Sequence, residues 1–295
     1  HTFTLRHDAT DQVAEENELN NVTGRQYIWT PHSVGNDQLV SRNSPPQDTG
    51  GWDQVTSDTN YYNCDGLAMP TSTNWWHAMA VWADSDANDF DCRLHTSSTG
   101  SQDGFGPYLQ YSAFGAGSLD VVMVNRNVVS GSSWDVGVPS WNGSGSYKAY
   151  HASSQILAFG DSTTVTMNQN QPILLREFYL GSSVFGPVSV TAYSDPNGEP
   201  LRLVVLSRDF DTGTVSSGSQ VGSAWIDATG LARVSATLET AGYYGIAVYR
   251  NQNNGLAARD VTIEISTTPP DLAPWTPSGW HAAITPRAAY DGTPS

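Results

Sequence analysis

Residues Asn74–Trp82 have the sequence NWWHAMAVW, in which aromatic and aliphatic side chains occupy most positions. Two-residue alternation places Trp76 and Trp82 on one face of an extended chain and Trp75 on the other. No window of the chain sustains the 3.6-residue period of an amphipathic helix. We therefore expect a β-strand here, with at least one of its faces in a hydrophobic core.

Similar apolar segments recur along the chain, and those of its first half are bounded by Gly, Asp or Asn. Before a Gly- and Ser-rich break over residues 131–146 they are Phe90–Leu94, Tyr108–Phe114 and Leu119–Val124. After the break they are Gln155–Phe159, Thr163–Met167, Ile173–Leu180, Val188–Tyr193, Leu201–Leu206, Ala224–Ile226, Val234–Leu238, Tyr243–Tyr249 and Val261–Ile265. Short strands separated by turn signals are typical of antiparallel sandwiches. The predicted fold class is all-β, with tandem antiparallel β-sandwich modules of jelly-roll or Ig-like type.

The two sets of strands resemble two copies of one design. Ala116–Asn127 aligns with Ala241–Asn251 with one gap, as internal repeats do. Thr30–Asp58 is rich in Pro and Gly and is interpreted as a linker or a long surface loop. The predicted organisation is the closing strands of an Ig-like domain (1–34), a first sandwich (50–150), a second sandwich (151–267), and a linker with the opening strand of an Ig-like domain (268–295).

Composition and charge restrict the possible partners. Of the 295 residues 14% are charged, the formal net charge is −16, and Lys148 is the only lysine. A nucleic-acid partner is excluded because no run of Lys or Arg can neutralise phosphates, and divalent cations suit an acidic chain better. No apolar run approaches the roughly 20 residues of a membrane span. We expect an extracellular, cell-surface protein, with the chain either a mature product or part of a longer one.

Two cysteines and two sequons fit that compartment. Cys64 and Cys92 would form one disulfide worth about 3–4 kcal/mol in an oxidising environment, and the alternative is two buried thiols. The motifs that begin at Asn21 and Asn142 match the acceptor pattern for N-linked glycans.

The acidic stretch 84–91 contains the strongest candidates for metal ligands. They are Asp84, Asp86, Asn88, Asp89 and Asp91. The first three have the alternate spacing of the first ligands in a calcium loop, but Asp89 stands where an EF loop needs Gly. A polar turn between strands is the alternative interpretation. Calcium is the one cofactor expected, because no His or Cys spacing suggests zinc.

Both ends of the chain suggest incomplete sheets. Thr2–His7 is expected to form a strand, and an acidic, Asn-rich turn leads to a second strand that ends at Trp29. Two strands cannot bury an apolar face, so this hairpin must complete a sheet supplied by this chain or by another copy. Near the other end, a Pro-rich linker leads to an expected edge strand. The expected interface residues are Phe3, Leu5, Tyr27, Trp29, Trp275 and Trp280.

The opening hairpin also carries a sequence pattern of an Asp, a Val and a Glu-rich run that closes on Asn-Asn: Asp8, Asp11, Val13, Glu15, Asn17, Glu18, Asn20 and Asn21. This pattern resembles the closing strands of the CARDB family, the cell-adhesion-related domains of bacterial surface proteins, and Pro270–Ala273 resembles the start of such a domain. The middle modules resemble the bacterial pre-peptidase C-terminal family of jelly-roll domains through Gly242–Tyr244, a place taken in the first module by Gly117–Leu119. The resemblances imply β-sandwich modules of a prokaryotic surface protein.

Motifs for catalysis are missing from the sequence: there is no Gly-x-Ser-x-Gly, no His-Glu-x-x-His and no P-loop. We expect a non-catalytic structural or adhesive protein whose copies join through terminal strands into a fibre or sheath. The alternative is a carbohydrate-binding module or an accessory domain of a secreted hydrolase. In that case Trp75, Trp76 and Trp82 would form a platform for cell-surface glycans, whereas core packing is the competing role for these side chains.

Overall fold

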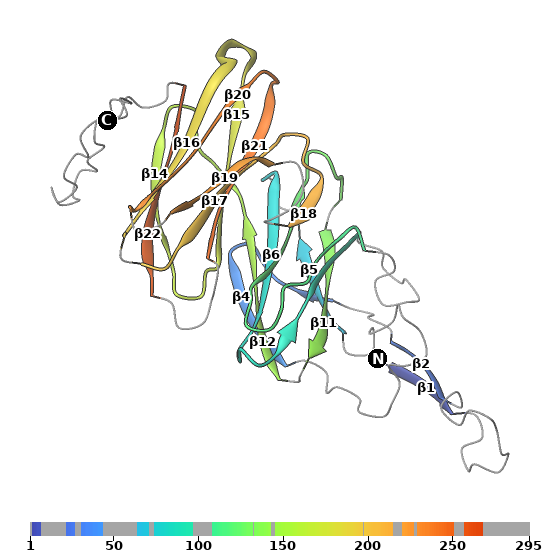
Figure 1. The fold of residues 1–295 in the computed structure, drawn as a ribbon. Helices are drawn as coiled ribbons and strands as arrows, with labels where there is room; N and C mark the ends of the chain where they lie inside the picture. Colours follow the sequence, from blue (N-terminus) through green and yellow to red (C-terminus); the bar gives the residue numbers. More distant parts are fainter. Residues whose placement is uncertain are drawn as a thin grey trace, which may run out of the picture.

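The structure is a computed structural model of the chain. It describes residues 2–6, 22–26, 31–43, 64–70, 74–96, 108–131, 133–142, 145–196, 198–214, 220–226, 229–250 and 257–267. Within these ranges nearly every element is a β-strand, and the single helical element is the 3₁₀ turn Ser182–Val184. The predicted all-β, predominantly antiparallel fold class is confirmed (Figure 1).

Two sheets form the first sandwich, which we call sandwich 1. Sheet I has the strand order β3 (His32–Ser33), β5 (Cys64–Pro70), β11 (Ser133–Asn142), β8 (Cys92–Thr96) and β9 (Gln110–Ser112), and β7 (Asp89–Phe90) also pairs with β11. Sheet II has the order β4 (Gln38–Asn43), β12 (Ser146–Ser153), β6 (Trp76–Ala83), β10 (Asp120–Asn125) and β18 (Thr212–Thr214).

Two further sheets form sandwich 2. Sheet III has the order β13 (Gln155–Ile156), β15 (Ile173–Leu180), β21 (Gly242–Arg250), β17 (Leu201–Leu206) and β19 (Gln220–Ile226). Sheet IV has the order β14 (Ser162–Met167), β22 (Arg259–Ser266), β16 (Gly186–Ser194) and β20 (Leu231–Leu238).

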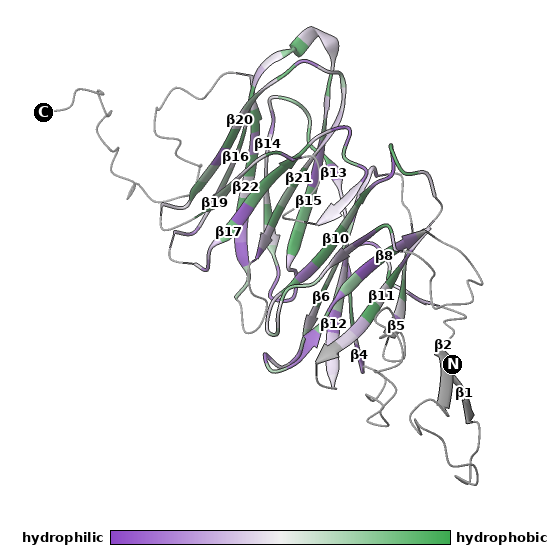
Figure 2. Cartoon of the chain, turned by 45° about the vertical axis from the view of Figure 1, so that its right-hand side comes forward, coloured by the Kyte–Doolittle hydropathy of each residue, from purple (hydrophilic) through white to green (hydrophobic). Residues whose placement is uncertain are grey.

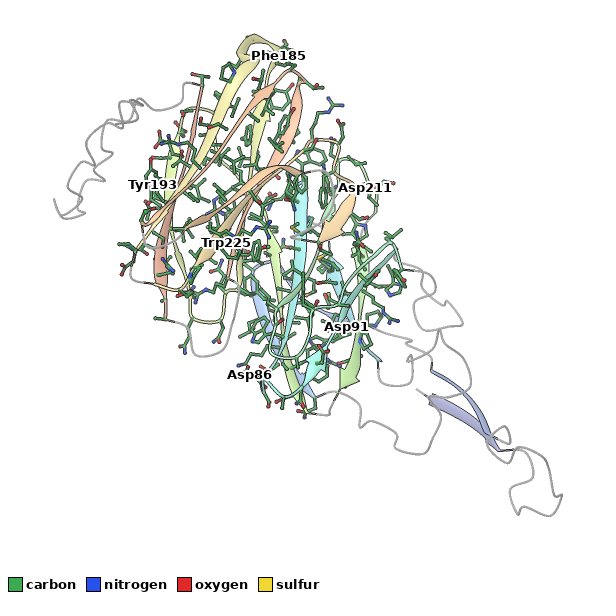
Figure 3. The ribbon with its side chains drawn as sticks, in the orientation of Figure 1. Asp86, Asp91, Phe185, Tyr193, Asp211 and Trp225 are labelled. Carbon is green, nitrogen blue, oxygen red and sulfur yellow. The ribbon has the colours of Figure 1, made fainter. Side chains whose placement is uncertain are left out.

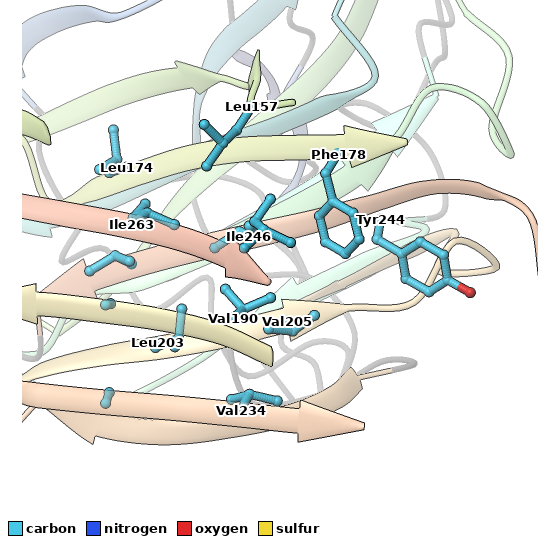
Figure 4. Packing of buried hydrophobic residues seen from close by; sticks show 14 of the residues in the cluster. Leu157, Leu174, Phe178, Val190, Leu203, Val205, Val234, Tyr244, Ile246 and Ile263 are labelled. Carbon is cyan, nitrogen blue, oxygen red and sulfur yellow. The ribbon is translucent and has the colours of Figure 1, made fainter. Parts of the chain in front are cut away.

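Three hydrophobic cores join the four sheets into one stack. One core lies between sheets I and II, and another lies between sheets III and IV. Figure 4 shows part of the latter, in which Phe178 stacks on Tyr244 with ring centroids 5.4 Å apart. The third core joins sheet II to sheet III through residues such as Trp76, Val121, Leu206 and others. Burial of each large aliphatic or aromatic side chain contributes about 1.5–3 kcal/mol, so the two sandwiches stabilise each other.

β6, the strand predicted from residues 74–82, is buried on both faces because it lies in an inner sheet. Trp76 and Trp82 face sheet III, while Met79 and Val81 face sheet I. All eight residues of β6 are buried. A strand covered on both sides has a nearly continuous apolar sequence, and Figure 2 shows β10, β15 and β21 of the two inner sheets largely in the green of hydrophobic residues.

Sandwich 2 donates a strand to sandwich 1. β18 follows β17 in sequence, yet it pairs with β10 in sheet II. The Asn125 amide N–H donates to the Asp211 carbonyl at 2.9 Å, and Asn125 Nδ2 donates to the Arg208 carbonyl at 3.1 Å. Phe210 packs on Trp76 with ring centroids 5.3 Å apart. The connection between β17 and β19 therefore completes the neighbouring sheet.

A buried carboxylate on sheet III ties the sandwiches together where β6 begins. Glu177 accepts a hydrogen bond from the Trp75 backbone N–H at 3.0 Å and another from the Ser154 hydroxyl. On the same interface Gly245 leaves room for an indole: a Cβ at this position would lie 2.7 Å from the Trp76 ring. Larger side chains at position 245 would push the two sheets apart.

The two sandwiches share part of their topology, which agrees with the predicted repeat. The order β5-β11-β8-β9 in sheet I matches β14-β22-β16-β20 in sheet IV, and the pair β6–β10 matches β15–β21. The aligned segments Ala116–Asn127 and Ala241–Asn251 contain β10 and β21, which take equivalent places. β18 lies beside β10 as β17 lies beside β21. The donated strand β18 therefore takes the place in sandwich 1 that β17 takes in sandwich 2.

Two expectations about connecting segments were wrong. Residues 32–43, expected in a linker, form β3 and β4, which complete edges of sheets I and II. The expected Gly- and Ser-rich break contains β11 and the start of β12, two strands of sandwich 1. Pairing with buried neighbours outweighs the low β-propensity of Gly and Ser in these strands.

The predicted opening hairpin is present as a two-stranded antiparallel sheet. β1 (Thr2–Arg6) pairs with β2 (Val22–Gln26), with Thr4 opposite Gly24. Neither strand pairs with another strand in the described part of the chain. Figure 1 shows both strands outside the two sandwiches. Among the described residues, no helix is long and apolar enough to cross a membrane.

Candidate metal centre

Three carboxylates meet at one edge of sandwich 1, and we call them the carboxylate cluster. Asp89, Asp91 and Asp120 each offer an oxygen, and these oxygens all lie within 4.8 Å of one another. Asp91 is 7% exposed, Asp120 is 1% exposed and Asp89 is partly buried. It is the only such group of acidic, His or Cys residues that the described ranges contain.

Backbone pairing fixes all three residues. Asp89 begins β7 and lies opposite Asn142 of β11. The Asp91 N–H donates to the Pro139 carbonyl at 3.1 Å in the step between β7 and β8. Asp120 is the first residue of β10, opposite Val81 of β6. The cluster thus joins sheet I to sheet II at the end of their shared core.

Asp120 also holds the segment that precedes β10. Its Oδ1 accepts hydrogen bonds from the Ser112 hydroxyl at 2.6 Å and from the Phe114 N–H at 3.0 Å. Ser112 Oγ in turn accepts from the Val121 N–H at 3.3 Å. These bonds fix the direction of the Asp120 carboxylate and anchor β9 to β10.

Burial opposes ionisation of the cluster. It raises the pKa of Asp120 to about 7, against the hydrogen bonds from Ser112 and Phe114. Burial raises the pKa of Asp91 to about 6, with added repulsion from Asp89 and partial relief from Arg93. The pKa of Asp89 is also raised by burial. Carboxylates held this close repel one another unless a proton or a cation lies among them.

The chemistry of the cluster fits a hard divalent cation. Converging carboxylate oxygens are the ligands that calcium prefers, and a cation would remove both the repulsion and the desolvation penalty that raise these pKa values. Asp89, Asp91 and Asp120 would hold it, and its role would be to join β7, β8 and β10.

The structure brings together two of the five predicted ligands. Asp84 forms an ion pair with Lys148 at 2.9 Å; burial opposes its ionisation, but hydrogen bonds from Ser146 and Lys148 lower its pKa. Asp86 is exposed and lies against Gly117, and Figure 3 shows it apart from Asp91. Asn88 lies in the turn, where its N–H donates to the Ser85 carbonyl at 3.0 Å.

Asp120 was missed by the sequence analysis. It lies far from the acidic stretch in sequence and reaches it only because β10 pairs with β6. The sequence feature that could have identified Asp120 is a single charged residue at the start of an otherwise apolar strand, since an isolated buried carboxylate needs a partner.

The tryptophans of the alternative glycan platform lie wholly or partly in the core. Trp76 is fully buried and Trp82 is 3% exposed. Trp75 is partly buried, with Tyr243 5.3 Å away and the Arg126 guanidinium 5.8 Å from its ring centroid. Core packing is therefore confirmed for Trp76 and Trp82.

The positions of the cysteines argue against the predicted disulfide. Cys64 lies on β5 and Cys92 on β8, and these strands pair with opposite sides of β11. Two strand spacings amount to about 9.5 Å, more than the roughly 7 Å between Cα atoms that a disulfide can span. The buried Cys92 thiol instead donates to the Met79 carbonyl at 3.9 Å.

The remaining predicted sites lie at or beyond the limits of the described residues. Asn142 is the last residue of β11. Phe3 and Leu5 lie on β1. Asn21, Tyr27, Trp29, Trp275 and Trp280 fall outside the described residues.

Comparisons with known proteins identify no family. No protein-family model matches the sequence, and no curated protein is significantly similar to it. The pre-peptidase C-terminal domain of a collagenase from Bacillus anthracis matches 38% of this chain and 93% of its own length, with 8% identity and a TM-score of 0.28.

Two other solved structures show similarly weak likenesses. A surface-associated copper-binding protein of Methylomicrobium album BG8 matches 39% of this chain and 99% of its own length, with 11% identity and a TM-score of 0.29. A secreted protein from Eubacterium rectale matches 90% of this chain and 91% of its own, with 9% identity and a TM-score of 0.26. At such TM-scores these likenesses assign neither a family nor a function to this chain.

Proposed function

We propose that the chain is a non-catalytic structural or adhesive part of an extracellular protein, a subunit or repeat of a surface fibre or sheath joined by strand complementation. The observation that carries this proposal is the hairpin. β1 and β2 pair with each other and with no other strand in the described part of the chain. A two-stranded hairpin is at best marginally stable in water, so it gains stability by joining a larger sheet.

Strand donation inside the chain supports the same principle. β18 leaves sandwich 2 and extends sheet II of sandwich 1. Backbone hydrogen bonds give such strand additions their affinity, and side chains on alternate positions give them specificity. The hairpin, with its CARDB-like sequence, would act between domains or copies as β18 acts between the sandwiches.

The stack of four sheets suits a load-bearing spacer. Its cores run through both sandwiches, so relative rotation of the sandwiches would expose apolar surface. Calcium bound at the carboxylate cluster would brace one end of sandwich 1, as a structural cation rather than a reactive one.

Sedimentation velocity over a range of concentrations tests the proposal. We expect the full chain to associate as its concentration rises. Thr4→Pro removes a backbone donor in the middle of β1 and should leave the chain monomeric, while Thr4→Val keeps a strand-forming residue and should preserve association. Circular dichroism checks that both variants retain the sandwiches. A full chain that stays monomeric at high concentration would contradict the proposal.

A further inference from the structure

Exposed aromatic side chains concentrate on one short segment of sandwich 1. The described residues include nine large hydrophobic side chains that are exposed, and four of them lie within residues 108–114. These four, which we call the aromatic strip, are Tyr108 (45% exposed), Leu109 (42%), Tyr111 (51%) and Phe114 (41%). Exposed apolar side chains gathered on one short segment mark a binding surface more often than a scattered apolar residue does.

The rings of the strip are held in place by their neighbours. The Arg93 guanidinium lies 5.7 Å from the centroid of the Tyr108 ring, a cation–π contact. Tyr108 and Tyr111 meet edge to face with centroids 5.3 Å apart, and the buried His95 lies 6.5 Å from Tyr108 in an edge arrangement. Rings fixed in advance lose less conformational entropy when a ligand binds.

The backbone beneath the strip is fixed as well. The Leu109 N–H donates to the Leu94 carbonyl at 2.7 Å. At the other end, Asp120 accepts from Ser112 and from the Phe114 N–H. The segment that carries the strip, β9 and the residues on either side of it, is therefore held by hydrogen bonds to β8 and to Asp120 of β10.

The exposed area of the strip is too small for a stable protein interface and fits a ligand with a small contact surface. Aromatic side chains have about 150–250 Å² of surface, so the three aromatic side chains of the strip, on average slightly less than half exposed, present about 200–350 Å², to which Leu109 adds a smaller area. A stable protein interface buries about 800 Å² on each partner. β9 has only three residues, which is too short a ladder for an added strand to gain much from backbone hydrogen bonds.

The charge of the chain favours a neutral ligand over an acidic one of that size. The chain carries a net charge of −16, and the charged group that contacts the strip is the single guanidinium of Arg93. The excess of negative charge over the whole chain disfavours acidic polymers as ligands. Tyrosine combines an apolar ring face with a hydroxyl that can form hydrogen bonds, which matches the C–H faces and hydroxyl groups of a sugar.

We propose that the aromatic strip binds a neutral polysaccharide through stacking on Tyr108 and Tyr111. The inference rests on the proposed adhesive role and names the class of partner for it. The binding surface differs from the alternative tryptophan platform, in which Trp76 and Trp82 are buried.

Native electrophoresis in gels containing hydroxyethylcellulose, dextran or soluble starch tests the inference, because a bound polysaccharide retards the protein. Wild-type protein should be retarded by at least one of the three. Tyr111→Ala should weaken that binding about tenfold or more, the equivalent of roughly 1.4 kcal/mol. The matched control is Tyr179→Ala, which removes an equally exposed tyrosine (51%) from sandwich 2 and should leave retardation unchanged.

Several results would overturn the inference. The wild-type protein could show no retardation in any of the three gels, or polygalacturonate could retard it equally. Both tyrosine variants could lose polysaccharide binding equally, or the sedimentation coefficient could change in Tyr111→Ala, which would indicate a protein interface. If the wild-type protein associates but binds no polysaccharide, only the proposed role of the strip is wrong. If it binds polysaccharide but stays monomeric, only the proposed strand complementation is wrong.

Discussion

Each sandwich contains one cluster of buried charged side chains, and the two clusters differ in composition. The cluster in sandwich 1 consists of Asp89, Asp91 and Asp120, three carboxylates whose pKa values are raised by burial. The cluster in sandwich 2 places Arg250 and Arg259 around one carboxylate and several backbone carbonyls. The arginine cluster thus contains its own counter-charge, whereas the carboxylate cluster leaves negative charge for a proton or a cation to neutralise.

The arginine cluster of sandwich 2 consists of Arg250, Arg259 and Glu199. Arg250 is fully buried, and its Nη2 donates to the carbonyls of Met167, Asn168 and Ala257 at 3.0–3.2 Å. Its Nη1 lies 3.1 Å from Glu199 Oε1, without the alignment of a hydrogen bond. Arg259 contacts the other Glu199 oxygen at 3.5 Å. Burial lowers the pKa of Arg250, and the field of Glu199 opposes that effect.

Removal of Arg250 should have the largest effect. Arg250→Met removes one donor from each of three carbonyls and one cation from the surroundings of Glu199, so we expect the free energy of unfolding to fall by about 3–5 kcal/mol in guanidinium titrations. Because the sandwiches share a core and β18, both should unfold in one shifted transition. Arg208→Met, at the surface, should have a far smaller effect. A large shift in that control would remove the contrast between buried and exposed arginines.

The second prediction concerns a pair of buried histidines that is confined to sandwich 1. His151 Nδ1 donates to the Val34 carbonyl at 2.8 Å, so in the neutral ring its Nε2 accepts from His77 Nδ1–H at 3.1 Å. His77 Nε2 is buried without a hydrogen-bond partner. Burial lowers the pKa of His77 to about 3, with added repulsion from His151, and burial lowers the pKa of His151 to about 4.

These histidines and the carboxylate cluster have opposite pH dependences. Below pH 6.5 the unfolded histidines bind protons that the folded pair does not, so they make stability rise with pH by about 1.4 kcal/mol per unit each. Asp91 and Asp120, with folded pKa values of about 6 and 7, stay protonated in the folded state while the unfolded state ionises above about pH 4. They make stability fall with pH by a similar amount each.

We therefore expect the two effects to cancel between about pH 4 and 6 when divalent cations are absent. Saturating calcium would keep Asp91 and Asp120 ionised in the folded state, so these two carboxyls would no longer oppose the effect of the histidines. The slope of the unfolding free energy against pH should then become more positive by about 2.7 kcal/mol per unit. Urea titrations across this range with calcium or with EDTA measure the difference. Equal slopes in the two conditions would mean that the cluster holds no cation.

Local features of the fold could be predicted from the sequence better than long-range ones. Apolar alternation identified β6 and most strands of sandwich 2, because two-residue periodicity is written in consecutive residues. It did not reveal β18, a three-residue strand of Thr and Gly whose stability comes from pairing with β10 of the other sandwich. β4 was missed for the same reason, since its partner β12 lies far along the chain.

The candidate site shows the same limit. Asp89 and Asp91 lie in one acidic stretch and could be proposed from spacing alone. Asp120 joins them only through the pairing of β10 with β6, and His77 meets His151 only because β12 pairs with β6 on the other side. Such contacts depend on strand order, which no local pattern in the sequence specifies.

The last prediction separates a cation site from a merely buried acid. Asp120→Asn keeps an oxygen that can accept from Ser112 and Phe114, but it removes a buried negative charge. Without divalent cations at pH 8, we expect the free energy of unfolding to rise by about 1–3 kcal/mol, because the amide needs no proton to be neutral. The stabilisation that calcium gives wild-type protein should be lost. Asp86→Asn, at an exposed position outside the cluster, should change stability by less than about 0.5 kcal/mol and keep the calcium response. Asp120→Asn could instead destabilise the chain without calcium and still be stabilised by calcium. The Asp120 carboxylate would then act as a structural hydrogen-bond acceptor, and the two clusters would not differ in their need for an outside counter-charge.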